Sequence, residues 1–182
     1  MTIDQMLETV PAYAKDLKLN LQVLLKQAEL TEQQTWGTVV AATIAARNTK
    51  LTEVLLPEAE KHLTPEAFNG AKSAAALMGM NNVYYRFTRM VPGEKYPTIP
   101  ARLRMQAIRT HGTDPVDFEL WCIAVSAINN CQACVTSHER VVLEKGMTAE
   151  TIVASVRIAA VVHALASVFD AEAAVPATVA AP

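Results

Sequence analysis

Apolar segments rich in alanine, leucine and methionine alternate along the chain with short polar stretches, and glycine is scarce. These residues, with the plentiful glutamate and glutamine, are strong helix formers, so the pattern predicts an all-α fold. We expect helices, short or full, near residues 2–9, 12–28, 32–47, 50–62, 65–80, 81–90, 101–109, 116–128, 131–144 and 149–171. Pro57 should kink or split the fourth of these. Three prolines and a glycine make Val91–Pro100 the clearest loop.

Polar clusters with the residue types that begin helices recur along the chain. Thr2 with Gln5, and Thr31 with Gln34, have the spacing of a capping box, in which each side chain bonds the backbone N–H of the other residue. Two further starts have a cap residue and an acid in the first turn. These are Thr64-Pro65-Glu66 and Thr148-Ala149-Glu150.

The two halves of the chain resemble one another. Trp36–Ala42 aligns with Trp121–Ala127 at an offset of 85 residues, and Thr64–Ala67 aligns with Thr148–Thr151 at an offset of 84. An alanine-rich helix is expected to follow in each half. We interpret this as a duplicated helical unit; the alternative is a chance match between two alanine-rich stretches.

A chain of 182 residues suits one compact domain, or one domain made of two similar halves. We therefore predict a single domain over residues 1–182 with an internal two-fold repeat. The degenerate repeat spans about 31–90, and the repeat with the candidate active site spans about 115–171. Residues 172–182 contain little besides alanine, valine and proline, and we expect them to fray.

The net charge and the length of the apolar stretches indicate which partners and which cellular compartment to expect. The formal net charge is −2 and no long basic block occurs, so neither nucleic acid nor a membrane is expected as a partner. Met1–Gln5 lacks the start of a signal peptide, and the apolar stretch Ile158–Phe169 is too short to span a bilayer. Three cysteines are too few for a secreted disulfide scaffold. We therefore expect a cytoplasmic protein.

Two cysteines and a histidine share one predicted helix. Cys131, Cys134 and His138 are spaced by three and four residues, which places them on one helical stripe. A helix that begins at Asn129-Asn130 would place its positive end beside the sulfurs. Reactive thiols at such ends have pKa values of roughly 3.5–7.5, against about 8.5 for a free cysteine. One cysteine can then attack and the other resolve, with His138 as base or proton shuttle.

Glu119 is a candidate partner for His138. Its neighbours Phe118, Leu120 and Trp121 are apolar, and a carboxylate among them is costly unless it is paired. A buried glutamate with a raised pKa could exchange protons with His138.

Other roles for these residues stay open. The side chains of Cys122, Cys131, Cys134 and His138 are four candidate zinc ligands, although structural zinc sites usually take a second pair from elsewhere. The cysteine pair could also be inert, and Cys122 is typical of a small core residue. Redox use is favoured over both alternatives.

The remaining histidines carry weaker signals. We expect His62 to cap a helix end, His111 to lie in a loop and His163 to be a core residue. The sequence contains no nucleotide-binding loop or dinucleotide fingerprint, so no tightly bound cofactor is expected.

The segment Phe118–Glu139 closely resembles the alkyl hydroperoxide reductase AhpD family, within the wider carboxymuconolactone decarboxylase-like group. Its specific pattern is a glutamate, then a Cys-x-x-Cys pair, then a histidine. Pro11–Leu21 and Met78–Arg86 are similar to the same family, so the resemblance covers nearly the whole chain.

The resemblance implies an AhpD-like helical fold, usually assembled as a homotrimer, and a lipoyl-dependent thiol peroxidase. By this likeness Cys134 would be the attacking thiol, oxidised to sulfenic acid, and Cys131 the proton donor and resolving thiol of a redox disulfide. Glu119 and His138 would form the proton relay. Dihydrolipoamide on a lipoylated acyltransferase, driven by lipoamide dehydrogenase, would reduce the disulfide. The protein would also deliver electrons to the peroxiredoxin AhpC.

One position departs from the family pattern. Some members carry a histidine just before the second cysteine, where this chain has Ala133. Intrinsic peroxidase activity could then be weaker, and disulfide exchange with a partner less affected. Two further functions therefore stay open: a redox adaptor between a lipoyl domain and a peroxiredoxin, and a decarboxylase-like enzyme that uses Glu119 and His138 without the thiols.

Overall fold

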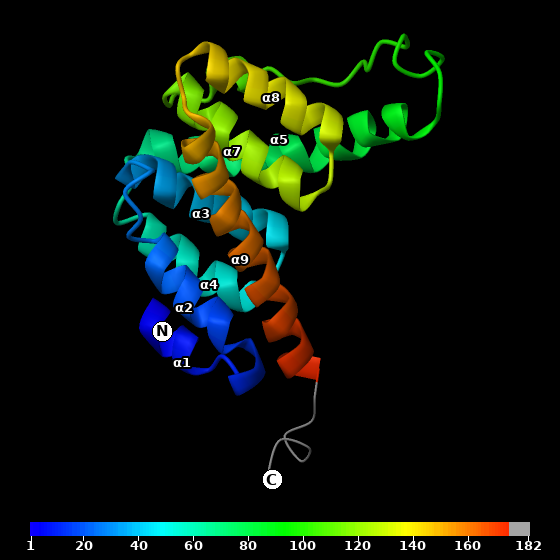
Figure 1. Cartoon of the computed structure of the whole chain (residues 1–182). Coiled ribbons are helices and arrows are strands. Elements are labelled where there is room, and N and C mark those ends of the chain that lie inside the picture. Colours follow the sequence, from blue (N-terminus) through cyan, green and yellow to red (C-terminus); the bar gives the residue numbers. More distant parts are fainter. Residues whose placement is uncertain (175–182) are drawn as a thin grey trace.

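The structure is a computed structural model that describes residues 1–174, and every regular element in this range is a helix (Figure 1). The elements are α1 (Ile3–Glu8), η1 (Ala12–Ala14), α2 (Lys15–Leu24), α3 (Glu32–Ala46), α4 (Thr49–Ala59), α5 (Pro65–Met90), α6 (Ala107–Thr110), α7 (Pro115–Ile128), α8 (Gln132–Glu144) and α9 (Ala149–Ala174). The predicted all-α class is confirmed.

Side-chain caps begin several helices where the sequence predicted. Both capping boxes form, at Thr2 with Gln5 and at Thr31 with Gln34. At the start of α5 the Ala67 N–H donates to the Thr64 hydroxyl. These bonds satisfy backbone donors that have no partner inside the helix, so local sequence is enough to set each start.

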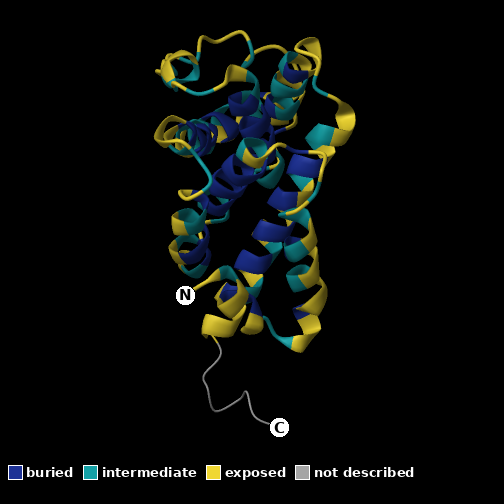
Figure 2. Ribbon diagram, turned by 90° about the vertical axis from the view of Figure 1, so that its left-hand side faces the viewer, coloured by how far each residue is buried: buried dark blue, intermediate teal, exposed yellow. Residues whose placement is uncertain are grey.

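Two helices, α3 and α7, form the centre of the molecule. Helix α3 packs against α5, α7 and α9, while α7 packs against α5, α8 and α9. Every residue from Thr35 to Thr43 is buried, and Figure 2 shows this buried interior in dark blue. Helices that are apolar on all sides belong in such a core. Helix α8 therefore lies against a fixed support, with α7 and α5 beneath it.

The closest approach between α3 and α7 depends on Gly37. The indole of Trp121, a fully buried side chain, lies directly against it, and a Cβ at position 37 would overlap the ring atoms. We expect Gly37→Ala to destabilise the protein by about 3 kcal/mol, because the overpacked ring has no free space to enter. The midpoint of thermal unfolding should fall by roughly 6–12 °C.

Gly79 on α5 is the matched control for this change. A Cβ there would meet nothing within 4 Å, so Gly79→Ala should leave stability unchanged or raise it by roughly 0.5–1 kcal/mol. Equal midpoints for the two variants, measured by circular dichroism, would show that the contact between Gly37 and Trp121 is not tightly packed.

Three predicted element boundaries are wrong. Helix α5 is continuous from Pro65 to Met90, with no break between residues 80 and 81. Helix α4 runs through Pro57 as far as Ala59, so proline does not split it. The helix predicted at 101–109 is only the short α6 (Ala107–Thr110). In α4 and α5 propensity failed because packing on neighbouring helices outweighs a few unfavourable residues. Residues 101–106 failed in the opposite direction, since the helix expected there does not form.

The internal repeat stays a prediction. The C-terminal helix α9 continues to Ala174, so residues 172–174 do not fray as expected. The rest of the predicted tail, residues 175–182, lies outside the described residues.

Within residues 1–174, α9 is the one helix long and apolar enough to cross a membrane, judged by length and composition alone. Half of its most apolar window is buried inside the protein, and a core helix passes the same test. This helix contains the stretch Ile158–Phe169 that the sequence showed to be apolar.

Candidate active site

A tight corner between α7 and α8 carries the first cysteine. Asn129 caps the end of α7, and Asn130 adopts the left-handed conformation with φ of 53°. Asparagine tolerates this region better than most residues, so it turns the chain at once. Cys131 follows as the N-cap of α8, which corrects the expectation that an asparagine would occupy that place. The Cys131 N–H donates to the Ser126 carbonyl at 3.0 Å and fixes the corner.

Cys131 and Cys134 are joined by a disulfide, and their Cα atoms lie 5.3 Å apart. Cys131 is fully buried and Cys134 is 5% exposed. Cys134 is the third residue of α8, so it lies among the free N–H groups of the helix start. Those groups and the helix dipole favour a negative charge on sulfur at that end.

A cavity of about 380 Å³ opens onto one of the two sulfur-bearing residues. Cys134 and His138 line it together with residues of α5, α6 and the segment before α6, whereas Cys131 does not. The cavity is lined by Asn81, Tyr85, Arg89, Met105, Ile108, Ala133, Cys134, Ser137 and His138. A small molecule can therefore approach Cys134, and Cys131 is shielded behind it.

His138 and Glu119 form the pair that the sequence suggested. Nδ1 of His138 lies 2.5 Å from Oε2 of Glu119, and the two side chains are 13% and 16% exposed. Glu119 comes from α7 and His138 from α8, one turn beyond Cys134. The carboxylate orients the imidazole of His138, and His138 lines the same cavity as Cys134.

Comparison with known proteins shows the family to which this chain belongs. A model of the Carboxymuconolactone decarboxylase family matches residues 94–177. A protein named Alkyl hydroperoxide reductase AhpD from Solibacter usitatus is 57% identical over 95% of this chain and 98% of its own length. This chain belongs to the AhpD family. AhpD proteins of the same name from Acidobacterium capsulatum and Streptomyces coelicolor are 56% and 50% identical, over 94% and 95% of this chain and 94% and 97% of their own lengths.

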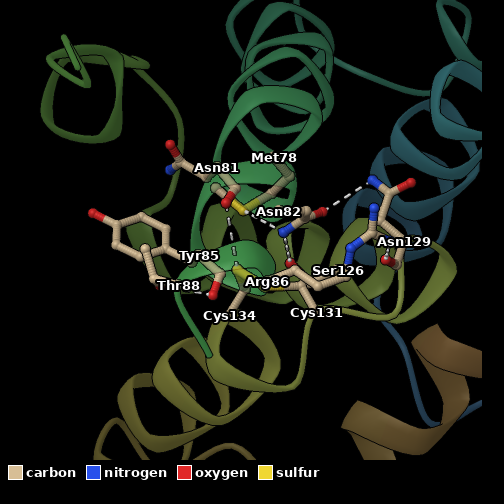
Figure 3. The surroundings of a disulfide bond; sticks show 10 residues. All are labelled: Met78, Asn81, Asn82, Tyr85, Arg86, Thr88, Ser126, Asn129, Cys131 and Cys134. Atoms are coloured by element: carbon tan, nitrogen blue, oxygen red, sulfur yellow. Dashed lines mark hydrogen bonds between the residues drawn. A yellow bond between two sulfur atoms is a disulfide. The ribbon is translucent and has the colours of Figure 1, made fainter. Parts of the chain in front are cut away.

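A partly buried polar network, which the sequence did not reveal, holds the corner of this AhpD family member (Figure 3). The Asn82 amide donates to the Ser126 hydroxyl at 2.9 Å, and the Asn129 amide donates to the Asn82 oxygen at 2.9 Å. The Arg86 guanidinium donates to the Asn129 carbonyl at 2.7 Å. Helix α5 thus bonds to α7 and to its C-terminal cap residue, just before the turn that leads to Cys131. The available signal was two adjacent asparagines, Asn81 and Asn82, at the place where the sequence predicted one helix to end and the next to begin.

The other predicted residues of this AhpD chain fall in different places. Cys122 is a fully buried core residue, as expected, and burial raises the pKa of its thiol well above the usual range. His111 stacks on Phe118 with 4.1 Å between ring centroids, and its partial burial lowers the pKa of the imidazole. It therefore stays neutral to lower pH than a free histidine.

Two expectations about histidines were wrong. His163 is exposed on α9 and is not a core residue. His62 does not cap α4, which ends at Ala59. Its ring stacks on Trp36 at 4.2 Å, and its Nδ1 lies 2.8 Å from Oε1 of Glu32.

No cluster of three or more histidine, cysteine or acidic side chains within residues 1–174 has a geometry that could hold a metal ion. The side chains of Cys122, Cys131, Cys134 and His138, which the sequence offered as zinc ligands, do not form such a cluster.

Proposed function

We propose that this protein is an alkyl hydroperoxide reductase, a thiol peroxidase that cycles between a dithiol and the Cys131–Cys134 disulfide. The observation that carries the proposal is that Cys134 and His138 line the same cavity. Relatives of 50–57% identity that carry the name Alkyl hydroperoxide reductase AhpD support the same reaction.

The first step is attack by the Cys134 thiolate on the terminal oxygen of the hydroperoxide. An S–O bond forms, the O–O bond breaks, and the alkoxide takes a proton to leave as an alcohol, so that sulfur is oxidised to sulfenic acid. Cys134 has this role because it lines the cavity and lies at the start of α8. The Cys131 thiol then attacks the sulfenic sulfur and releases water, which closes the disulfide.

The pair of Glu119 and His138 manages the protons. His138 can carry a proton from the thiol of Cys134 or Cys131 to the departing alkoxide, and Glu119 holds the imidazole in place. A water molecule is expected to bridge any gap, since the imidazole is one helical turn beyond the sulfur.

The disulfide must be reopened by a dithiol, and we propose dihydrolipoamide carried by a lipoylated acyltransferase with lipoamide dehydrogenase. Cys134 is only 5% exposed, so the reductant must be slender enough to enter the cavity. A dithiol on a flexible arm has that shape, and it completes the exchange within one molecule. Transfer of electrons onward to AhpC, a homotrimeric assembly and a cytoplasmic location belong to the same proposal.

The test uses the full chain reduced with a dithiol and freed of excess reagent without oxygen. Mixing with cumene hydroperoxide should yield one alcohol and one Cys131–Cys134 disulfide per chain, and dihydrolipoamide should then sustain turnover. Protein thiols that survive excess hydroperoxide would contradict the proposal. Turnover that appears only after AhpC is added would favour the adaptor function, as Ala133 allows.

A further inference from the structure

One buried polar side chain beside Cys134 has no partner. Asn81 is 4% exposed, and its Oδ1 atom is buried without a hydrogen bond. Its neighbour Asn82 has the same side chain, but there both the amide nitrogen and the amide oxygen form hydrogen bonds, to α7 or to the turn after it. Most buried polar groups are bonded, and an unbonded one costs free energy, so an exception at this place calls for a purpose.

Asn81 lies against the proposed reaction centre. It lines the cavity of about 380 Å³ together with Cys134 and His138, and its own carbonyl oxygen is 4.0 Å from the Cys134 sulfur (Figure 3). Its side chain points away from the disulfide and toward the side of Tyr85, another cavity residue.

The other polar side chains that line the cavity are exposed, half-buried or already hydrogen-bonded. Arg89 and Ser137 are exposed, Tyr85 is only half-buried, and His138 is already bonded to Glu119. Asn81 is therefore the buried neutral group of this lining that is free to meet a ligand. Within residues 1–174 its amide nitrogen forms no hydrogen bond either, and unlike Oδ1 it is not among the fully buried unpartnered atoms, so the N–H end is the one that can meet a ligand.

We propose that Asn81 is a catalytic residue that contacts the peroxide, an inference that rests on the proposed function. Its side-chain N–H donates a hydrogen bond to the oxygen that departs when the Cys134 thiolate attacks. As the O–O bond breaks, negative charge gathers on this oxygen until His138 delivers the proton that completes the alcohol. A donor on the cavity wall that meets that charge stabilises the transition state more than it stabilises the bound peroxide.

The decisive variant is Asn81→Leu, which keeps the size of the side chain and removes the amide. Loss of one such donor should lower the second-order rate constant for oxidation of the reduced protein by cumene hydroperoxide roughly 100-fold. Reduction of the disulfide by dithiothreitol has no departing alkoxide and should stay within about twofold of the wild-type rate. The unfolding midpoint should be unchanged or higher, because the variant buries no unbonded polar group.

Stability separates this role from a structural one. A residue that only supported the fold would lower the unfolding midpoint and slow oxidation and reduction together. That result would overturn the proposal, as would a wild-type oxidation rate in Asn81→Leu. Thr43→Val is the matched control: it removes another buried unpartnered side-chain oxygen, from α3 and outside the cavity, and should leave both rates unchanged.

A second pair of variants decides the matter if Asn81→Leu does not fold. Asn81→Ser retains a donor and Asn81→Ala retains none, while both reduce the side chain by a similar amount. We expect the serine variant to react with the hydroperoxide at least about fivefold faster than the alanine variant; equal rates would overturn the proposal. Failure of the wild-type protein to react at all would instead refute the proposed function.

Discussion

Replacing Cys134 with serine should lower the rate of peroxide reduction on the order of 10³-fold or more. A serine hydroxyl is scarcely ionised near neutral pH, and the start of α8 cannot compensate for the loss of a thiolate. The measurement is single-turnover loss of cumene hydroperoxide with the pre-reduced chain. A variant that retains the wild-type rate would rule out Cys134 as the nucleophile.

Replacing Cys131, the resolving cysteine, should give a different phenotype. Cys131→Ser leaves the attacking sulfur in the cavity but removes the thiol that resolves it, so the first oxidation should proceed and then stop. The sulfenic acid should persist long enough to react with dimedone, and mass spectrometry would locate the adduct on Cys134. An adduct on Cys131 in the reciprocal Cys134→Ser variant would reverse the two roles.

Cys122 is the internal control for these experiments. Its complete burial and raised pKa keep it as a thiol, so it should resist iodoacetamide while the protein is folded. Cys122→Ser should therefore leave the oxidation rate unchanged, apart from any loss of folded protein.

The sequence predicted those parts of the site that lie close together along the chain. Cys134 and His138 are one turn apart on α8, and helical periodicity alone places them on one face. Glu119 was found because a carboxylate among apolar neighbours needs a partner, and the structure supplies His138. The prediction that α8 would begin with an asparagine cap failed, because Asn130 is used for the left-handed turn.

The residues that α5 contributes to the site could not be predicted from the sequence in this way. Asn81 and Asn82 lie about 50 residues before the cysteines, and nothing in their local pattern indicates which helix they will face. In isolation two adjacent asparagines weaken a helix, and the predicted boundary between 65–80 and 81–90 falls just before them. In the folded chain Asn82 and Arg86 bond to the α7–α8 corner instead, and those bonds offset the poor propensity.

The second large effect should come from the pair of His138 and Glu119. His138→Gln removes the proton carrier, and we expect oxidation by cumene hydroperoxide to slow roughly 100-fold. Glu119→Gln leaves the imidazole without its negative partner and should cost roughly 10-fold or more. The rates are measured in single turnover at neutral pH with each reduced variant.

The double variant tests whether the two side chains act as one unit. If Glu119 works only through His138, losing both should slow the reaction no more than losing His138 alone, so the separate effects will not add. Glu144→Gln is the control, since this carboxylate is also on α8 but pairs with Arg140 at the surface, with side chains 59% and 64% exposed. It should leave the rate unchanged, because exposed ion pairs contribute little. If the fold-losses in rate of the two single variants multiply in the double variant, the carboxylate acts on the reaction independently of the imidazole.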